Sequence, residues 1–445
     1  MRCFPLIAFL TAQISLLNAQ LLPQLTLTNV TLPFPLLAGD QAWRLWVMRD
    51  LYAYPLYVVP LQNGRSLIGW TDSNLNGHVS LLNTKDDYIM WTRNFNGLHV
   101  RGVAAITNVT DGAFAVFLWN ATESSVSLSY WNADNTRKWR TPINIVNPWV
   151  SKPTKFKIGD SRAAYGGDGF FAVYYHVRSY DGHEGDALYY FDSQTGAQRP
   201  NTGWGWGCSH SMNSLLDFHP TSKKSMALCV SDCYADTAIL VFNGRYKIQR
   251  VNGNCAGGAG AELGGMAANF NTWGVVFTSQ TDQTIVSTPP SQMEVGYMVL
   301  NGTTGQPMTQ LKWLTTPNPG FWKTDAAIAR WGPPSTSTRE SPLLVGWASD
   351  PEGSKVTTNW YGLSNNMTYS VALINPTTGD FIQQPIDLPK SVFWGRRDDP
   401  FHTKADGSVM WVYGDRNTNI LRIAKYQFSS GSATAVNRMA PALPI

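Results

Sequence analysis

A β-type segment that ends in a polar, glycine-tending turn recurs seven times along the chain. The copies occupy residues 78–87, 126–135, 187–196, 238–244, 295–305, 369–379 and 421–431. Each copy follows a more apolar, often aromatic run, and these runs occupy residues 66–72, 115–121, 170–177, 225–231, 273–279, 342–349 and 408–415. Near-continuous apolar sequence is typical of strands buried on both faces. Because no long stretch has the 3.6-residue period of a helix, the chain is predicted to be all-β.

A third run of small or apolar residues precedes these two, as at 102–107, 264–269 and 325–331, and a weaker fourth strand often follows the turn, as at 137–143. Three or four antiparallel strands repeated seven times predict a seven-bladed β-propeller, built as a single domain over residues 20–445. The predicted blades are approximately 55–97, 98–143, 157–199, 210–250, 260–314, 324–388 and 396–428. The chain resembles secreted seven-bladed β-propellers in architecture, without a WD, kelch or Asp-box signature. An array of β-sandwiches and a six-bladed propeller are the alternatives.

The alternating segment 24–34 belongs to none of the predicted blades, whereas the last blade has only three clear strand runs. A propeller must close its ring to avoid exposed sheet edges. We therefore expect residues 24–34 to supply the outer strand of the last blade and to tie the two termini together.

The first 19 residues predict a secretory signal peptide. Arg2 precedes an apolar stretch that is too short and too interrupted for a membrane span, and Ala19 ends an acceptable cleavage site. The mature protein is therefore expected to be secreted and extracellular, with no membrane span. Five Asn-x-Ser/Thr sequons are compatible with N-glycosylation, at Asn29, Asn108, Asn120, Asn301 and Asn366.

Four cysteines remain once the signal peptide is removed: Cys208, Cys229, Cys233 and Cys255. An even number in a secreted chain favours two disulfides, with three pairings open. A zinc site is the alternative, but the spacing is not Cys-x-x-Cys and an oxidising compartment disfavours thiolates. The cysteines are expected to gather on one face, over the fourth predicted blade.

The resemblance to propellers implies that ligand-binding groups lie where the innermost strands begin, at one face of a central funnel. The residues that open these strands are polar although only 14% of the chain is charged. The candidates for ligand binding are His99, Arg101, Asp160, Arg162, Asn213, Glu262, Asp325, Arg397 and Asp398, with Trp204 and Trp206 in a glycine-rich loop. Arginine binds carboxylate or sulfate through paired hydrogen bonds, and an exposed Trp stacks on sugars. The alternative is a funnel filled by ion pairs between blades, with the Trp rings packed in a blade corner.

His210, in the segment GWGWGCSHSMN, is the candidate catalytic residue, because a histidine can act as acid or base near neutral pH. The alternative is a histidine that bonds only to its own loop. The acidic loop 181–186 is a weak calcium candidate with the wrong spacing for a known template, so no cofactor is expected. A net charge of +4 without a Lys/Arg cluster argues against a nucleic-acid partner.

Three functions are compatible with these observations. The first is an extracellular propeller that binds a glycan or another polar or anionic matrix ligand at the funnel face. The second is a carbohydrate-active enzyme, either a polysaccharide lyase or a glycoside hydrolase. The third is a structural component of a matrix or wall. The sequence carries no recognisable catalytic motif, and we therefore favour binding over catalysis.

Overall fold

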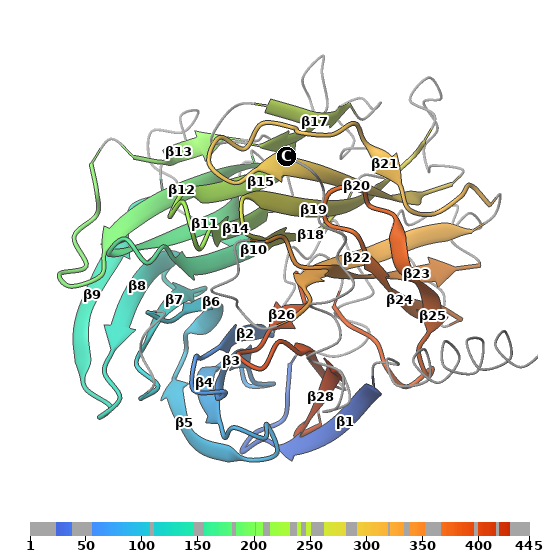
Figure 1. The fold of residues 1–445 in the computed structure, drawn as a ribbon. Helices are drawn as coiled ribbons and strands as arrows, with labels where there is room; N and C mark the ends of the chain where they lie inside the picture. The colour runs from blue at the N-terminus through green and yellow to red at the C-terminus, as the bar shows by residue number, and fades with distance from the viewer. Residues whose placement is uncertain are drawn as a thin grey trace, which may run out of the picture.

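The computed structural model describes residues 24–37, 56–106, 111–145, 155–179, 184–200, 202–207, 214–231, 238–241, 246–250, 262–281, 292–318, 321–332, 339–351, 366–395, 399–414 and 418–427. These residues form seven four-stranded antiparallel sheets (Figure 1). The predicted all-β propeller is therefore confirmed. In six of the sheets, four strands that are consecutive in sequence lie side by side, from an innermost to an outermost strand.

The strand bounds follow the repeat read from the sequence. The first two sheets hold β2 (Tyr57–Pro60), β3 (Ser66–Thr71), β4 (Gly77–Leu82) and β5 (Ile89–Phe95), then β6 (His99–Ala104), β7 (Phe114–Asn120), β8 (Ser125–Trp131) and β9 (Arg137–Ile143). The next two hold β10 (Phe156–Tyr165), β11 (Phe170–Ser179), β12 (Glu184–Asp192) and β13 (Trp204–Gly207), then β14 (Ser214–Phe218), β15 (Ser225–Ser231), β16 (Ala238–Val241) and β17 (Tyr246–Arg250). The fifth and sixth hold β18 (Glu262–Ala268), β19 (Thr272–Ser279), β20 (Glu294–Asn301) and β21 (Lys312–Trp313), then β22 (Trp322–Arg330), β23 (Leu343–Asp350), β24 (Thr368–Ile374) and β25 (Phe381–Asp387). The last holds β26 (His402–Thr403), β27 (Val409–Gly414), β28 (Ile420–Gln427) and β1 (Gln24–Thr31).

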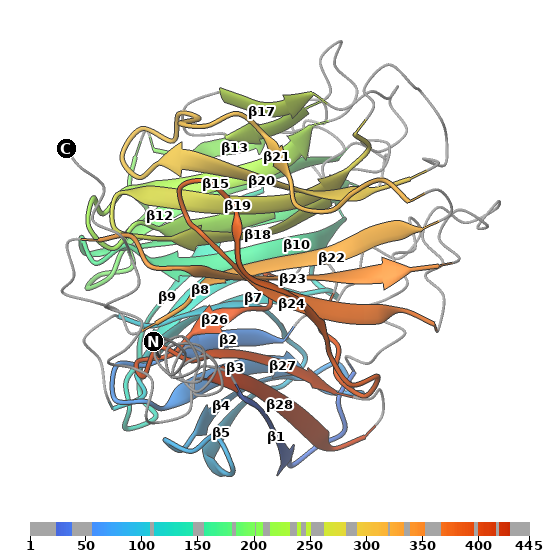
Figure 2. The same cartoon turned by 45° about the vertical axis from the view of Figure 1, so that its right-hand side comes forward.

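The innermost strands form a closed ring (Figures 1 and 2). Contacts run in sequence order from β2 to β6, β10, β14, β18, β22 and β26, and β26 returns to β2. All innermost strands run in the same direction along the axis of the ring. Their first residues therefore lie together at one end of this axis. This end, where the innermost strands begin, is called the mouth below.

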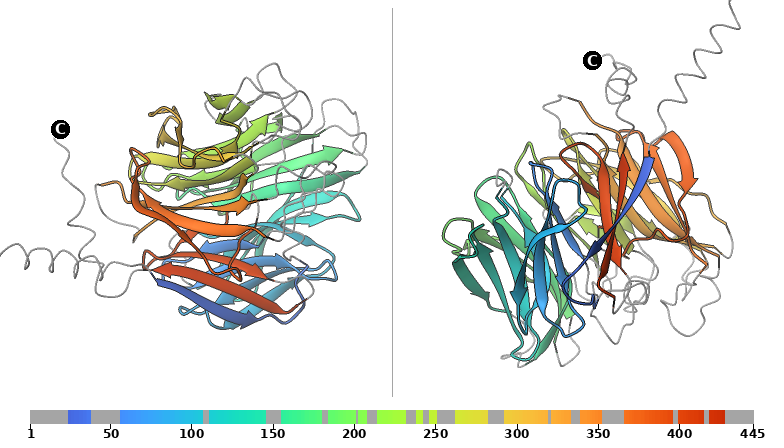
Figure 3. Two further views of the ribbon diagram at one scale, coloured as in Figure 1. Left: turned by 90° about the vertical axis from the view of Figure 1, so that its right-hand side faces the viewer. Right: turned by 90° about the horizontal axis from the view of Figure 1, so that it is seen from below.

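Strand β1 completes the last sheet, as the alternation of residues 24–34 predicted. It pairs antiparallel with β28 from Gln24 opposite Gln427 to Thr31 opposite Ile420. Figure 3 shows this blue strand running along the red strands of the C-terminal sheet. The sheet that closes the ring thus combines the two ends of the described chain.

The core lies between neighbouring sheets. The tryptophans predicted there, Trp70, Trp119, Trp347 and Trp411, are all buried. Near the centre the sheets approach so closely that no side chain fits at some positions. A Cβ added at Gly264 would lie 2.5 Å from both the Cβ and the carbonyl oxygen of Ala326 on the next innermost strand.

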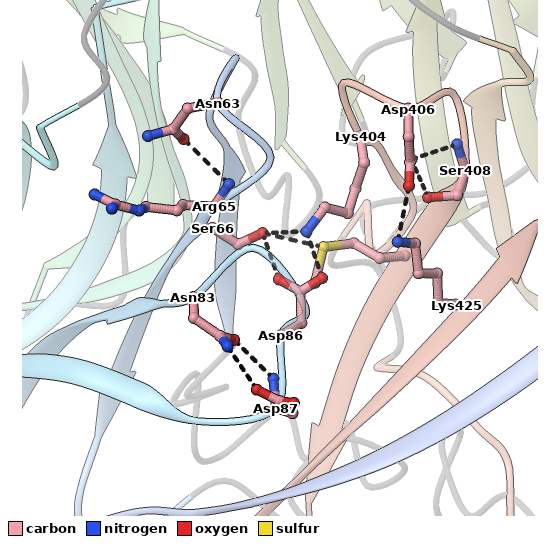
Figure 4. Close-up of polar contacts among 11 residues, drawn as sticks. Asn63, Arg65, Ser66, Asn83, Asp86, Asp87, Lys404, Asp406, Ser408 and Lys425 are labelled. Atoms are coloured by element: carbon pink, nitrogen blue, oxygen red, sulfur yellow. Dashed lines mark hydrogen bonds and ion pairs between the residues drawn. The ribbon is translucent and has the colours of Figure 1, made fainter.

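A buried ion pair reinforces the junction between the last and the first sheet (Figure 4). The Lys404 ammonium binds the Asp86 carboxylate and donates to Ser66 Oγ at 3.1 Å, while Ser66 Oγ donates to the other Asp86 oxygen at 3.1 Å. The side chains of Lys404 and Asp86 are each only 2% exposed. The nearby pair of Lys425 and Asp406, at 2.9 Å, lies at the surface. The junction that closes the ring therefore contains a desolvated charge pair as well as strand β1.

Several sequence predictions fall outside the described residues, including the signal peptide 1–19, Asn108, Cys208, Cys233 and Cys255. Cys229 is buried in β15 and disulfide-bonded, and its pairing stays a prediction. Asn29 and Asn366 are exposed, and Asn120 and Asn301 are half-buried. Within the described part of the chain, none of the residues forms a helix with the length and hydropathy of a membrane span.

Candidate functional site

Four innermost strands carry a β-bulge close to the mouth. The register between each of these strands and its neighbour shifts between Val100 and Gly102 in β6, Ile158 and Ser161 in β10, Leu263 and Gly265 in β18, and Thr324 and Ala327 in β22. A bulge leaves an extra residue out of the ladder and re-aims its side chain, and bulges are enriched next to binding and active sites.

The residues at these bulges include three of the predicted ligand-binding residues. Arg101, Asp160 and Asp325 each fall inside a register shift and have no ladder partner. Glu262 directly precedes the bulge of β18, with its side chain 4% exposed. Three of the polar residues near the start of the innermost strands are thus redirected by the backbone irregularity, whereas His99, Arg162 and Glu262 keep regular strand partners.

Asp325 is held in an unusual backbone conformation. Its φ is +52°, in the left-handed region that costs most L residues energy, and its side chain is 3% exposed. Two buried groups fix it in place: Tyr369 OH donates to Asp325 Oδ2 at 2.8 Å, and Trp394 Nε1 donates to its carbonyl oxygen at 2.6 Å. Strain of this kind persists only where the surroundings over-determine it, and it clusters at functional sites.

A threonine joins two carboxyl groups from neighbouring sheets. Thr324 Oγ1 lies 3.0 Å from Glu262 Oε2 and 3.0 Å from Asp325 Oδ1, so these two oxygens are at most 6.0 Å apart. The hydroxyl has one hydrogen and donates to one carboxyl at a time. A proton held on the other carboxyl would complete the hydrogen-bonded chain.

One further contact reaches between sheets that are not neighbours in the ring. Asp399, which precedes β26 in the last sheet, packs over β18, where a Cβ added at Gly265 would lie 2.6 Å from Asp399 Oδ1. Strand β22 lies between β18 and β26 in the ring.

Both arcs of the ring carry charges of both signs at the mouth. The arc from β18 to β26 holds Glu262, Asp325 and Asp399 together with Lys323, whereas β6 and β10 hold Arg101 and Arg162 together with Asp160. Burial, followed by the Arg162 charge, lowers the pKa of His402 to about 4. The imidazole of His402 is therefore neutral at physiological pH.

His99 and Arg101 are buried, as are Glu262 and Asp325. His99 and Arg101 are both buried against Trp119, with the Arg101 guanidinium 5.0 Å from the indole centre and the two ring centres of His99 and Trp119 also 5.0 Å apart. Burial and then the Arg101 charge lower the pKa of His99 to about 4. These two side chains are placed to support the site from beneath, whereas Asp160, Lys323, Asp399 and His402 are half-exposed.

The structure describes only part of the loop that contains the catalytic candidate. His210, Asn213, Arg397 and Asp398 lie outside the described residues, as does the side chain of Trp206. Trp204 is half-buried, and its ring packs edge-on against Tyr174 with centroids 5.7 Å apart. This contact places Trp204 against the blade, as the packing alternative expects.

Four buried polar groups near the mouth were not found from the sequence. Ser279 faces Glu294 directly across β19 and β20, and Thr278 faces Glu262 across β18 and β19. Four buried atoms have no hydrogen-bond partner among the residues described: Thr278 Oγ1, Ser279 Oγ, Glu294 Oε1 and Trp322 Nε1. Burial raises the pKa of Glu294, opposed by the Thr315 hydroxyl, by Lys323 and by the Asn318 amide. Buried polar atoms without protein partners are the usual positions of bound water or ligand.

No group of three metal-ligating side chains occurs among the residues that the structure describes. Of the calcium candidate loop, Asp181 and His183 fall outside those residues, and Asp186 accepts a hydrogen bond from Tyr174 OH at 2.8 Å. The described site is therefore built from carboxylates, guanidinium groups and hydroxyls.

Comparisons with known proteins identify no family. No protein-family model matches the chain, and no curated protein sequence matches it. Among solved structures, the chain is similar to the GH93 α-L-arabinofuranosidase of Fusarium graminearum in complex with arabinobiose (TM-score 0.45, 10% identity, 90% of this chain and 97% of that chain). It is also similar to the WD40 domain of Toxoplasma gondii coronin (TM-score 0.45, 10% identity, 91% and 87%) and to the Penicillium chrysogenum α-L-arabinanase in complex with arabinobiose (TM-score 0.42, 9% identity, 90% and 99%). At such scores and identities these likenesses carry no argument about function.

Proposed function

We propose that this protein is an extracellular propeller that binds a glycan at the mouth of its ring. One observation carries the proposal: polar and charged residues open several innermost strands at one end of the ring, and β-bulges re-aim Arg101, Asp160 and Asp325 there. Asp399 Oδ1 also lies against Gly265 of β18, in a sheet that is not its neighbour in the ring.

The chemistry of these groups fits a polyhydroxylated ligand. Carboxylates accept hydrogen bonds from sugar hydroxyls, while Lys323 and Arg162 donate to hydroxyl, carboxylate or sulfate oxygens. Asp160, Asp399 and Lys323 are half-buried and so retain some exposed surface, unlike the fully buried Glu262 and Asp325. The buried Glu262, Thr324 and Asp325 beneath them fix the positions of the strands that carry the site.

The extracellular location is part of the proposal and is supported by the sequence. The predicted signal peptide and the sequons at Asn29 and Asn366, whose side chains are exposed, are consistent with passage through the secretory route. Detection of the mature chain in culture medium, beginning after Ala19, would be the direct test.

A glycan array with purified protein tests the binding proposal. Wild type is expected to bind a defined set of glycans, and Asp160→Asn and Asp399→Asn are each expected to bind more weakly. Asp168→Asn is the matched control, because Asp168 is exposed in the turn at the opposite end of β10. An array on which wild type binds nothing, or on which the two mouth variants bind like wild type, would contradict the proposal.

A second candidate function, glycoside hydrolysis, is favoured by the two carboxyl groups joined by Thr324. Retaining glycosidases place their two carboxyl groups about 5–5.5 Å apart. The separation of at most 6.0 Å between Glu262 Oε2 and Asp325 Oδ1 is compatible with that arrangement. If the protein is a glycoside hydrolase, it should release reducing ends from a bound glycan, and Glu262→Gln should abolish this release. Binding without any release would leave the first proposal standing and exclude this one.

A further inference from the structure

A buried arginine lies in the seam between the first two sheets. Arg93 belongs to β5, the outermost strand of its sheet, and its side chain faces the sheet of β6–β9. The residue is only 8% exposed, and its Nε and Nη1 atoms are buried without an acceptor among the residues that the structure describes. Because a guanidinium stays protonated in proteins, this is a buried positive charge.

Three aromatic rings surround the Arg93 guanidinium. Its central carbon lies 4.7 Å from the ring centre of Trp131, 5.3 Å from Phe114 and 5.6 Å from Trp91. The ring faces attract the cation, but they do not accept hydrogen bonds as an oxygen does. The N–H groups at Nε and Nη1 of Arg93 therefore remain unsatisfied within the described part of the chain, which is costly for buried donors.

The neighbouring polar atoms are donors too. Trp131 Nε1 is buried and finds no acceptor in the described ranges of the chain. The exposed Arg137 guanidinium lies 5.9 Å from the centre of the same Trp131 ring. Two guanidinium groups thus lie against the ring of Trp131, and the indole N–H of that same side chain is a third donor.

The nearest opposing charge is that of Asp134, which is exposed. Its carboxylate already accepts from the Thr136 amide at 2.9 Å and from the Thr136 hydroxyl. Burial lowers the pKa of Arg93, and the attraction of Asp134 only partly opposes that shift. Asp134 therefore leaves the charge of Arg93 incompletely balanced.

We propose that the cluster of Arg93, Trp131 and Arg137 is an anion-binding site, separate from the mouth, that takes a sulfate or carboxylate group. A cluster that offers only donors requires a ligand group that only accepts, and these two anions meet that requirement. A sugar hydroxyl, which must also donate, fits this cluster less well. The anion is either an inorganic ion or the charged substituent of a saccharide, and both sources share the same chemistry.

Calorimetric titration with sodium sulfate, at an ionic strength held constant with sodium chloride, tests the site. Wild type is expected to bind one sulfate here. Trp131→Phe keeps a ring but removes the indole donor, and is expected to weaken binding about tenfold. Arg137→Gln changes an exposed side chain and is expected to weaken it about threefold. Arg93→Gln is expected to abolish it.

The matched control is Arg140→Gln, because Arg140 is an exposed arginine on the same strand as Arg137 and donates to Ser127 Oγ at 3.1 Å. It is expected to bind sulfate like wild type. A second titration with a monosulfated monosaccharide identifies the source: tighter binding than sulfate indicates a sulfated saccharide, and equal binding indicates the inorganic ion. No sulfate binding by folded wild type, or equal binding by wild type, Trp131→Phe and Arg137→Gln, would overturn the proposal.

Discussion

Replacement of Lys404 by methionine is the perturbation with the largest expected effect on the closed ring. Methionine fills much the same space but leaves the Asp86 carboxylate buried, with Ser66 Oγ as its remaining hydrogen-bond donor among the described residues. Removal of one partner from a buried ion pair costs about 3–5 kcal/mol, because the other charge stays desolvated. The 2% exposure of both side chains places Lys404→Met in that range.

The pKa of Lys404 indicates which second substitution should recover part of the stability lost in Lys404→Met. Burial lowers this pKa although Asp86 opposes the shift, so desolvation outweighs the attraction between the two charges. Removal of both charges should therefore cost much less than removal of one. Asp86→Asn is a suitable second change, since Asp86 has a φ of +59° that asparagine tolerates. The double variant is expected to recover about 2 kcal/mol or more.

Urea unfolding followed by tryptophan fluorescence measures these differences. Lys425→Met is the control, because its pair with Asp406 is exposed to solvent and is worth about 1 kcal/mol or less. A midpoint for Lys404→Met within the error of the control would refute the reasoning. So would a double variant that is less stable than Lys404→Met alone.

Two further predictions concern the centre of the ring. The pKa of His99 is about 4 in the folded protein and 6.5 in the unfolded chain. Between these two pH values the unfolded chain binds a proton that the folded protein does not bind. The free energy of unfolding should therefore fall by about 2 kcal/mol as pH is lowered through this window. Unfolding curves at pH 7 and pH 4.5 check this, and His99→Gln should remove that part of the pH dependence; an unchanged dependence would contradict it. Gly264→Ala should cost about 1–3 kcal/mol because its Cβ meets both the side chain and the backbone of Ala326. A thermal midpoint equal to that of wild type would show that β18 and β22 can separate freely.

The overall architecture could be predicted because the strands and the turns between them have recognisable sequence patterns. Apolar runs mark the strands buried on both faces, and glycine-containing turns separate them. Apolar and polar residues alternate in the segment 24–34, which belongs to none of the blades read from the sequence. Because the ring must close, the outer edge of the last blade was the expected position of this segment. The structure pairs this segment with β28 for that reason.

The site could be predicted only in outline. Asp160 and Asp325 were recognised as polar residues at the start of innermost strands, but the bulges that hold them were not. A bulge adds one residue to a ladder, and its sequence signal was limited to adjacent glycines such as Gly102, Gly159 and Gly264. Those glycines could have indicated the irregularity.

Other groups were missed because their properties arise only in three dimensions. In the sequence, Glu294 and Ser279 are ordinary polar residues at strand ends. In the folded chain both are buried, and Glu294 Oε1 and Ser279 Oγ have no hydrogen-bond partner among the described residues. Arg93 lies in an outer strand, where an arginine normally reaches solvent. Its burial depends on Phe114 and Trp131, which come from a different sheet.

Calorimetric titration of the tightest glycan from the array tests the central claim most directly. The mouth proposal predicts that Asp399→Asn weakens binding at least tenfold relative to wild type, as expected for loss of a charged hydrogen-bond acceptor. It also predicts that Asp168→Asn, at the other end of β10, binds like wild type. Equal affinities for wild type and Asp399→Asn, or a loss confined to Asp168→Asn, would place the ligand elsewhere and contradict the account.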